Sequence, residues 1–311
     1  MTFSTILKKH NTILSECAVS ERLRRLPDIE LHPTLFNTPL IYDEIGRRRL
    51  EEIYLSYIEV ARKGKFPLLL CAPTWRVDRV RIEEAGVPHS INHDAVEFMR
   101  GLRDRYSSAA SPIIAGALLA PRNDCYSPAA ALGREESAEV HGWQIEQLAG
   151  TEAEVIIAQT MPAVSESLGM ADRLGRTTKP YVISFVIDRT ARVLDATPLA
   201  EAVDIIDQEA ARPPAGYMVN CVYPTFIRAD QQPPALFSRL IGIQANSSSK
   251  DHAQLDGAEE LQQDPLSDWG REMLLLNKEY GVKILGGCCG TDHTYLRYLA
   301  ESLRAVRFRI L

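Results

Sequence analysis

Eight short apolar runs punctuate the chain, and each is bounded by polar or turn-forming residues. Most of these runs are continuous rather than alternating and are rich in Val, Ile and Leu, which is typical of strands covered on both faces in a parallel sheet. The predicted strands are residues 12–15, 67–72, 112–118, 154–159, 181–187, 217–221, 239–244 and 282–285.

Segments with helical periodicity lie between these runs. In residues 41–63, for example, Leu50, Tyr54 and Ile58 fall on one stripe and charged residues fall elsewhere. Residues 223–238 are rich in proline and leave room only for a short helix. The other predicted helices are residues 94–106, 135–149, 165–175, 199–210, 267–280 and 294–306.

Repeated alternation of strand and helix predicts an α/β protein, a single (β/α)8 TIM-type barrel that forms one domain over residues 1–311. The alternative is a doubly wound open sheet. No G-x-G-x-x-G motif follows the first run, which removes the main sequence support for a dinucleotide-binding fold. Residues 247–263 are predicted to be a long loop or a short insertion rather than a domain boundary.

Length and charge narrow the classes of function. A chain of 311 residues that is 45% hydrophobic can bury a sizeable core, and its net charge of -6 gives no electrostatic reason to expect nucleic acid or an anionic membrane as a partner. No apolar run approaches membrane-spanning length, and no signal-peptide core begins the chain. Six cysteines without a secretion signal indicate reduced thiols, so we expect a cytoplasmic protein. The sequence leaves open whether the protein forms a homo-oligomer.

Two adjacent cysteines stand in a glycine-rich turn between the last predicted strand and the last helix, in the stretch Gly286-Gly287-Cys288-Cys289-Gly290-Thr291. Neighbouring thiolates suit a soft metal, and glycines permit a backbone that points both sulfurs at one centre. The alternative is a tight turn with two small buried hydrophobic residues. Cys221 ends the sixth run. Because active residues of a barrel lie at the carboxyl ends of its strands, we expect Cys221, Cys288 and Cys289 to meet on one rim.

Three cysteines with one open coordination position are typical of a catalytic zinc site. Asn220-Cys221 after a strand, followed by Gly-Gly-Cys-Cys-Gly-Thr, resembles the homocysteine S-methyltransferase family, which includes the betaine-dependent enzymes and the homocysteine domain of cobalamin-dependent methionine synthase. Weaker likenesses lie at residues 14–24, 157–166 and 244–247. The resemblance implies Zn2+ held by Cys221, Cys288 and Cys289, and methyl transfer from a small donor to a thiol such as homocysteine, forming methionine. No cobalamin- or folate-binding domain is expected, which favours a small donor or one delivered by a separate protein.

Two positions depart from the family pattern. The family has an Asp followed by glycines where this chain reads Ser15-Glu16-Cys17, and a Glu where this chain has Gln159. The resemblance implies that this Glu binds the amino group of homocysteine, and a neutral Gln loses the charge-assisted part of that bond. Glu166 is a candidate replacement. The predicted substrate contacts are Glu16, Gln159, Glu166 and Asn246.

These departures leave other functions open. One is acceptance of a thiol other than homocysteine. Another is a non-catalytic or regulatory zinc-binding barrel that has lost the homocysteine site, and a third is a metal-free barrel enzyme with buried cysteines.

Several other side chains are expected near the rim. Trp75 could stack on a methyl donor and Arg76 could hold a carboxylate, although loop packing explains both equally well. Tyr126, in the long loop after the third run, is a further candidate. Asn220 would face away from Cys221 in a regular strand, and either caps the strand end or bonds to a ligating sulfur. The remaining cysteines are expected to be small buried residues: Cys17, Cys71 and Cys125.

Overall fold

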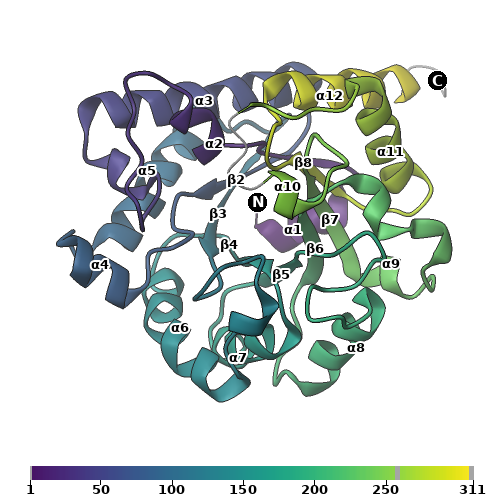
Figure 1. Ribbon diagram of the computed structural model, residues 1–311. Helices are drawn as coiled ribbons and strands as arrows, with labels where there is room; N and C mark the ends of the chain where they lie inside the picture. The colour runs from purple at the N-terminus through teal and green to yellow at the C-terminus, as the bar shows by residue number, and fades with distance from the viewer. Residues whose placement is uncertain (1, 256–259, 308–311) are drawn as a thin grey trace.

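A closed barrel of eight parallel strands, ringed by helices, forms the molecule (Figure 1). The computed structural model describes residues 2–255 and 260–307. Each strand pairs with the next one in the sequence, and β8 pairs with β1 to close the barrel. The (β/α)8 prediction is therefore confirmed and the open sheet is excluded. The strands are β1 Ile13–Ser15, β2 Leu68–Ala72, β3 Ile113–Leu119, β4 Val155–Met161, β5 Tyr181–Phe185, β6 Gly216–Val222, β7 Leu240–Ala245 and β8 Ile284–Gly287.

The outer ring contains a helix at every place where the periodicity predicts one. Asp43 caps the N-terminus of the longest helix, residues 44–64, because its side chain accepts a hydrogen bond from the Gly46 amide. The ring helices are α3 Glu44–Gly64, α5 Ile91–Tyr106, α6 Arg134–Ala149, α7 Val164–Leu174, α8 Leu199–Glu209, α11 Leu266–Lys278 and α12 His293–Arg307. The proline-rich connection after β6 holds the short helix α9 Leu236–Arg239 and the 3-10 turns η3 Pro224–Ile227 and η4 Ala229–Gln231.

Short elements that the periodicity does not reveal complete the chain. They are α1 Phe3–Lys9, α2 Ser20–Arg24, η1 Thr38–Ile41, α4 Arg79–Ala85, η2 Pro128–Ala130 and α10 His252–Leu255. Helix α1 inserts Phe3 and Ile6 among the inward-facing side chains of the strands, and so fills one end of the barrel. Helix α10 lies in the insertion after β7 and crosses the opposite end in Figure 1.

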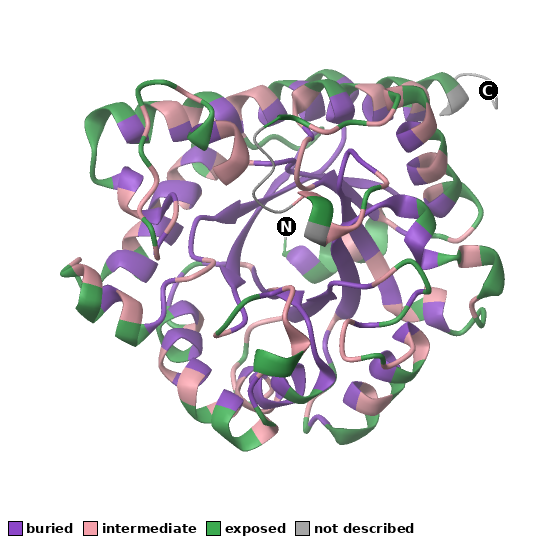
Figure 2. Ribbon diagram, in the orientation of Figure 1, coloured by how far each residue is buried: buried purple, intermediate pink, exposed green. Residues whose placement is uncertain are grey.

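Burial follows the two layers of a barrel. Ile13, Leu69, Ile114, Val182 and Met218 pack inside it, and a larger apolar cluster lies between the strands and the helices. The strands are buried along nearly their whole length, whereas the outer faces of the helices are exposed (Figure 2). This confirms that the continuous apolar runs mark strands covered on both faces. None of the helices in the described part of the chain is long and apolar enough to cross a membrane.

Two strands become irregular near their carboxyl ends. In β4 the register shifts between Ala158 and Met161, and Thr160 adopts a φ of 66°. In β6 the register shifts between Asn220 and Val222, and Cys221 adopts a φ of 55°. Left-handed conformations cost a residue with a Cβ about 1–3 kcal/mol and concentrate at functional sites. Both irregularities open toward the same rim of the barrel.

Candidate metal centre

Three sulfur atoms meet at the rim where the irregular strands end. The Sγ atoms of Cys221 and Cys288 are 2.7 Å apart, those of Cys288 and Cys289 are 3.9 Å apart, and all three lie within 4.8 Å of one another. Cys221 comes from β6, and the other two come from the turn after β8. The barrel thus brings together Cys221 and Cys288, which are 67 positions apart in the sequence. In the described part of the chain, no other group of three or more His, Cys, Asp or Glu side chains is placed to hold a metal ion.

The paired cysteines are held by the end of the neighbouring strand β7. The Cys288 amide donates to the Ala245 carbonyl at 2.8 Å, and the Cys289 amide donates to Asn246 Oδ1 at 3.1 Å. Gly290 follows with a φ of 77°, and a Cβ built there would lie 1.9 Å from Ser247 Oγ. The turn therefore needs glycine at this position both for its backbone conformation and for the close approach of Ser247.

Asn220 connects Cys221 to strands β4 and β5. Its Nδ2 lies 3.3 Å from Cys221 Sγ and 2.8 Å from Thr160 Oγ1. Its Oδ1 accepts hydrogen bonds from the Thr160 amide at 2.9 Å and from Ser184 Oγ at 2.6 Å. Because the strand is irregular at Cys221, both side chains reach the same space, and the alternative in which Asn220 bonds to the sulfur is confirmed. The fully buried amide thus fixes the position of the cysteine.

The donor set fits a zinc ion. Zn–S bonds of about 2.3 Å at tetrahedral angles separate two bound sulfurs by about 3.8 Å, which is close to the Cys288–Cys289 spacing. Cys221 and Cys288 would move apart by about 1 Å to share an ion. Hydrogen bonds from the Cys288 and Cys289 thiols lower the pKa of Cys221 well below its usual value, and the bond to Cys221 raises the pKa of Cys288. One of the three sulfurs is thereby favoured as a thiolate, the form that binds metal.

Tyr126 reaches the cysteines from the loop after β3. Its hydroxyl is one of the groups that lower the pKa of Cys221, and its ring stacks on His252 of α10 with centroids 4.8 Å apart. The ring of a half-buried tyrosine therefore lies between the sulfurs and the insertion after β7. This placement agrees with the expectation that Tyr126 lies at the rim.

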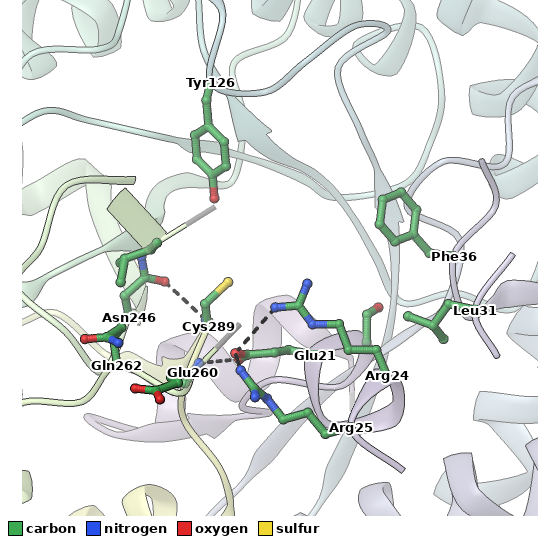
Figure 3. A pocket seen from close by; sticks show the side chains of 13 residues that line it. Glu21, Arg24, Arg25, Leu31, Phe36, Tyr126, Asn246, Glu260, Gln262 and Cys289 are labelled. Carbon is green, nitrogen blue, oxygen red and sulfur yellow. Dashed lines mark hydrogen bonds and ion pairs between the residues drawn. The ribbon is translucent and has the colours of Figure 1, made fainter. Parts of the chain in front are cut away.

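A cavity of about 180 Å³ opens beside Cys289. Its wall includes Asn246 and Tyr126, as well as Glu21 and Arg24 from helix α2 and Phe36 from the following loop. Figure 3 shows the Arg24 guanidinium and the Tyr126 hydroxyl directed into the same space as the Cys289 sulfur. The cavity gives a small molecule access to the cysteine cluster.

The predicted substrate contacts have different surroundings. Asn246 lines the cavity. Gln159 is partly buried in β4, and its Nε2 donates to Gln244 Oε1 at 2.6 Å. Glu16 is buried, and its Oε2 accepts a hydrogen bond from the Cys71 amide at 2.8 Å. Burial raises the pKa of Glu16 to about 8, so its carboxyl group keeps its proton at neutral pH.

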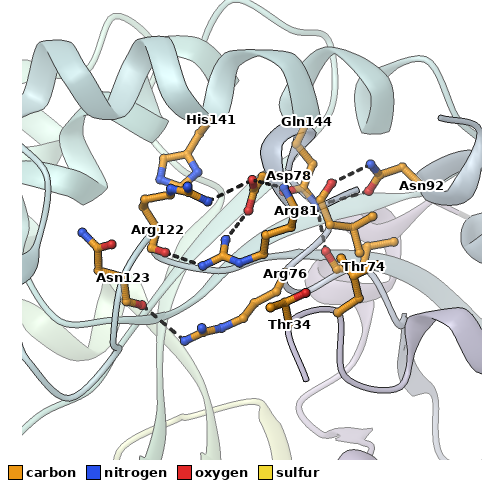
Figure 4. Close-up of polar contacts among 12 residues, drawn as sticks. Thr34, Thr74, Arg76, Asp78, Arg81, Asn92, Arg122, Asn123, His141 and Gln144 are labelled. Carbon is orange, nitrogen blue, oxygen red and sulfur yellow. Dashed lines mark hydrogen bonds and ion pairs between the residues drawn. The ribbon is translucent and has the colours of Figure 1, made fainter. Parts of the chain in front are cut away.

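The structure does not bring Glu166 to the cysteines. Its buried carboxylate accepts hydrogen bonds from the amides of Arg122 at 2.7 Å and Leu132 at 3.3 Å, and pairs with His141 Nε2 at 2.9 Å. Figure 4 shows the adjoining polar network, in which the Arg122 guanidinium pairs with Asp78 at 3.0 Å. Both oxygens of Glu166 are thus engaged in holding the loop after β3 against helices α6 and α7.

Trp75 and Arg76 lie at the rim as expected, but they pack against each other. The Arg76 guanidinium lies 4.8 Å from the centroid of the Trp75 ring and 5.5 Å from that of Phe36. Arg76 Nη2 donates to the Asn123 carbonyl at 3.2 Å, and Trp75 Nε1 donates to the Gln159 carbonyl at 3.3 Å. The two side chains brace the loops after β2 and β3.

The three cysteines expected to be small buried residues, Cys17, Cys71 and Cys125, are buried. Sequence reasoning missed the contribution of α2, whose residues Glu21 and Arg24 line the cavity. A five-residue helix is too short for a periodic signal. The available signal was the charged sequence that follows the first strand, at the end where a barrel places its active residues.

Comparisons with known proteins agree with this arrangement. The family model described as Homocysteine S-methyltransferase matches residues 4–303. The fold is similar to that of the homocysteine methyltransferase MmuM from Escherichia coli. The metallated form has a TM-score of 0.73 at 17% identity, covering 96% of this chain and 98% of that one. The oxidized form has a TM-score of 0.72 at 17% identity, with 95% and 97% covered. No curated protein matches the chain by sequence.

Proposed function

Because the chain belongs to the homocysteine S-methyltransferase family, we propose that it transfers a methyl group from a small activated donor to the sulfur of a thiol such as homocysteine, which would form methionine. The observation that carries this proposal is the meeting of Cys221, Cys288 and Cys289 beside a cavity that admits a small molecule. A methylated sulfur forms when the acceptor sulfur attacks the methyl carbon and the donor's bond to that carbon breaks, with its electron pair leaving on the donor. No covalent bond to the protein is needed.

We propose that Cys221, Cys288 and Cys289 hold Zn2+. Zinc bound there would keep the acceptor sulfur deprotonated yet nucleophilic at neutral pH, because three protein thiolates already make the centre electron-rich. Asn220 would hold Cys221 through its bond to Sγ, and Asn246 would hold Cys289 through its bond to the amide. The stacked rings of Tyr126 and His252 would limit access of water from the side of the insertion.

The amide groups at the rim are the proposed substrate contacts. Asn246 lines the cavity, and Gln159 is partly exposed on β4. The carboxyl groups of Glu16 and Glu166 are bonded to backbone amides, so we assign them a supporting role. This leaves no free buried carboxylate among the predicted contacts to bind an ammonium group, which makes a thiol without that group an alternative acceptor to homocysteine.

The same observation favours a second candidate, a zinc-binding barrel without methyltransferase activity. Measuring bound zinc and methyl transfer on one reduced sample separates the two. We expect about one zinc per chain and methylation of at least one thiol by S-methylmethionine, S-adenosylmethionine or betaine. Bound zinc without any methylated thiol would instead support the second candidate.

A matched pair of variants tests the metal site itself. Cys288→Ser should lose both zinc and methyl transfer, since a hydroxyl group does not supply a thiolate ligand. Cys71→Ala removes a buried thiol that lies outside the cluster and should retain both properties at somewhat lower stability. If Cys288→Ser keeps its zinc, the three cysteines are not the metal ligands.

A further inference from the structure

The Arg24 guanidinium in the wall of the cavity has little to hold it within the protein. Its Nη2 lies 3.8 Å from Glu21 Oε1, at the limit of an ion pair, and its side chain is 47% exposed. Among the residues that the structure describes, Arg24 donates no hydrogen bond to another side chain or carbonyl. Figure 3 shows the guanidinium directed into the cavity beside Cys289 rather than outward along α2.

Glu21 is already balanced by other partners. Its Oε1 forms an ion pair with Arg25 Nη2 at 3.1 Å, and its Oε2 accepts a hydrogen bond from the Gly290 amide in the cysteine turn. The side chain of Glu21 is only 14% exposed, so its carboxylate meets little water and relies on these two bonds. Its charge is therefore matched by Arg25 and the amide, and the charge of Arg24 remains available to a ligand.

The other groups in the wall do not compete for Arg24. Glu260 is exposed and forms no ion pair with Arg24 in the described ranges 2–255 and 260–307. Asn246, Gln262 and Tyr126 are neutral, while Phe36 and Leu31 are apolar. A ligand that fills the cavity thus meets the weakly paired guanidinium of Arg24, the Glu21 carboxylate already bonded to Arg25, the exposed carboxylate of Glu260, neutral polar groups and an apolar surface, with a sulfur atom at the end.

We propose that Arg24 binds the carboxylate of the small substrate that lies against Cys289, so that the enzyme selects a substrate with an acid group at one end and its reacting atom at the other. A guanidinium offers paired donors that match the two oxygens of a carboxylate. The inference rests on the proposed function, since it assigns a substrate class to the same site. Arg24 acts as a specificity residue, and the carboxylate belongs to the thiol acceptor or to the methyl donor.

Two acceptors that each lack one group of homocysteine test the assignment with a fixed donor. 4-Mercaptobutyrate keeps the carboxylate, and 3-mercaptopropylamine keeps the amine. We expect kcat/KM for 4-mercaptobutyrate to exceed that for 3-mercaptopropylamine by about 10- to 100-fold, the effect of one charge-assisted hydrogen-bond pair. Arg24→Gln should remove this difference mainly through KM, and Arg24→Lys should retain part of it.

A donor series identifies which substrate carries the carboxylate. With neutral 2-mercaptoethanol as acceptor, dimethylsulfoniopropionate carries an acid group and trimethylsulfonium does not. If Arg24→Gln weakens only the first of these donors, the carboxylate belongs to the donor. If it weakens only the acidic acceptor, the carboxylate belongs to the thiol. Arg271→Gln, which removes an exposed arginine on α11, is the control and should change neither series.

A binding measurement separates failure of this inference from failure of the proposed function. Calorimetric titration of the whole protein with 4-(methylthio)butyrate and with 3-(methylthio)propylamine requires no turnover. We expect the acid to bind at least about 10-fold more tightly and Arg24→Gln to abolish that preference. Equal affinity for the two ligands together with unchanged use of dimethylsulfoniopropionate by Arg24→Gln, or a preference for the acid that persists in Arg24→Gln, overturns the assignment even if the protein methylates thiols. An intact preference without any methylated thiol overturns only the proposed reaction.

Discussion

The side-chain amide of Asn220 lies 3.3 Å from the sulfur of Cys221, the residue that follows it in β6. Neighbouring residues of a regular strand point to opposite faces, so this contact requires the left-handed backbone of Cys221. The amide also bonds to the backbone N–H and the hydroxyl of Thr160, which has a left-handed backbone of its own in β4. Two strained residues from different strands are thus joined through one buried amide.

The first prediction concerns this amide. Asn220→Ala leaves the Thr160 amide and the Ser184 hydroxyl without their acceptor and Cys221 without its donor, so the variant should lose about 1–3 kcal/mol of unfolding free energy. It should also hold zinc about 10- to 100-fold more weakly, as is usual when a group that orients a metal ligand is removed. Urea unfolding and competition with a chelator measure the two effects.

Asn92→Ala is the matched control. Asn92 is also fully buried, and its amide donates to the Val77 carbonyl in the loop after β2 and bonds to none of the three cysteines. It should lose comparable stability and keep its zinc affinity. If the two variants release zinc equally, Asn220 supports the fold and does not orient the cysteine.

The second prediction uses the glycine that ends the cysteine turn. Gly290→Ala places a Cβ 1.9 Å from Ser247 Oγ on a backbone with a φ of 77°. We expect a loss of unfolding free energy of about 3 kcal/mol or more and weaker zinc binding, because the turn must shift and carry Cys289 with it. Thermal unfolding and zinc competition are the measurements.

Gly86→Ala separates the two causes. Gly86 has a φ of 62°, and a Cβ there would meet nothing within 4 Å. This variant therefore carries the backbone strain alone, about 1–2 kcal/mol, and should leave zinc binding unchanged. Similar losses in the two variants would show that Ser247 gives way at no cost.

The order of the strands and the meeting of the cysteines were predictable from the sequence, because buried parallel strands have continuous apolar runs and their carboxyl ends share one rim. The orientation of individual side chains was not. The left-handed backbone of Cys221 has no sequence signal, since residues with a Cβ rarely adopt it. Glu166 was predicted to reach the substrate, but its partner His141 lies 25 positions away on another helix, a pairing that local periodicity cannot show.

Glu16 illustrates the same limit. Its place just after β1 was predicted, but the direction of its side chain depends on the register between β1 and β2, which brings the Cys71 amide within 2.8 Å of its carboxyl group. A residue expected to face a substrate is instead buried beside a backbone amide. Its chemistry therefore follows from burial, which raises its pKa, more than from its position in the motif.

The third prediction follows from that raised pKa. Between about pH 4.5, the ordinary value, and about pH 8, the folded protein keeps the Glu16 proton that the unfolded chain releases. In this window the folded state binds more protons than the unfolded state, so the free energy of unfolding falls as the pH rises. The total loss, complete by about pH 8, is on the order of 5 kcal/mol. Glu16→Gln has no such proton to lose. Relative to the wild type, the variant should gain stability steadily from pH 5 to about pH 8 and then level off.

Urea unfolding of both proteins at several pH values tests this sign. The difference between the two curves isolates Glu16, because the thiols titrate in both proteins, provided that both are reduced and metal-free. A difference that stays constant from pH 5 to pH 8.5 would mean that Glu16 ionises normally inside the barrel.

The last prediction concerns the charge at residue 159. Gln159 donates to Gln244 Oε1 at 2.6 Å, and the Nε2 of Gln244 lies 3.0 Å from Ser15 Oγ, so a neutral chain of amides crosses the barrel mouth. Gln159→Glu adds a carboxylate there and should raise the ratio of kcat/KM for homocysteine to that for 4-mercaptobutyrate by about 10-fold or more, because only homocysteine offers an ammonium group to pair with it. Gln147→Glu adds the same charge at an exposed position on α6 and should leave the ratio unchanged. An equal ratio in all three proteins would place residue 159 outside the reach of the acceptor's amino group, and the neutral residue there would then have no bearing on which thiol is methylated.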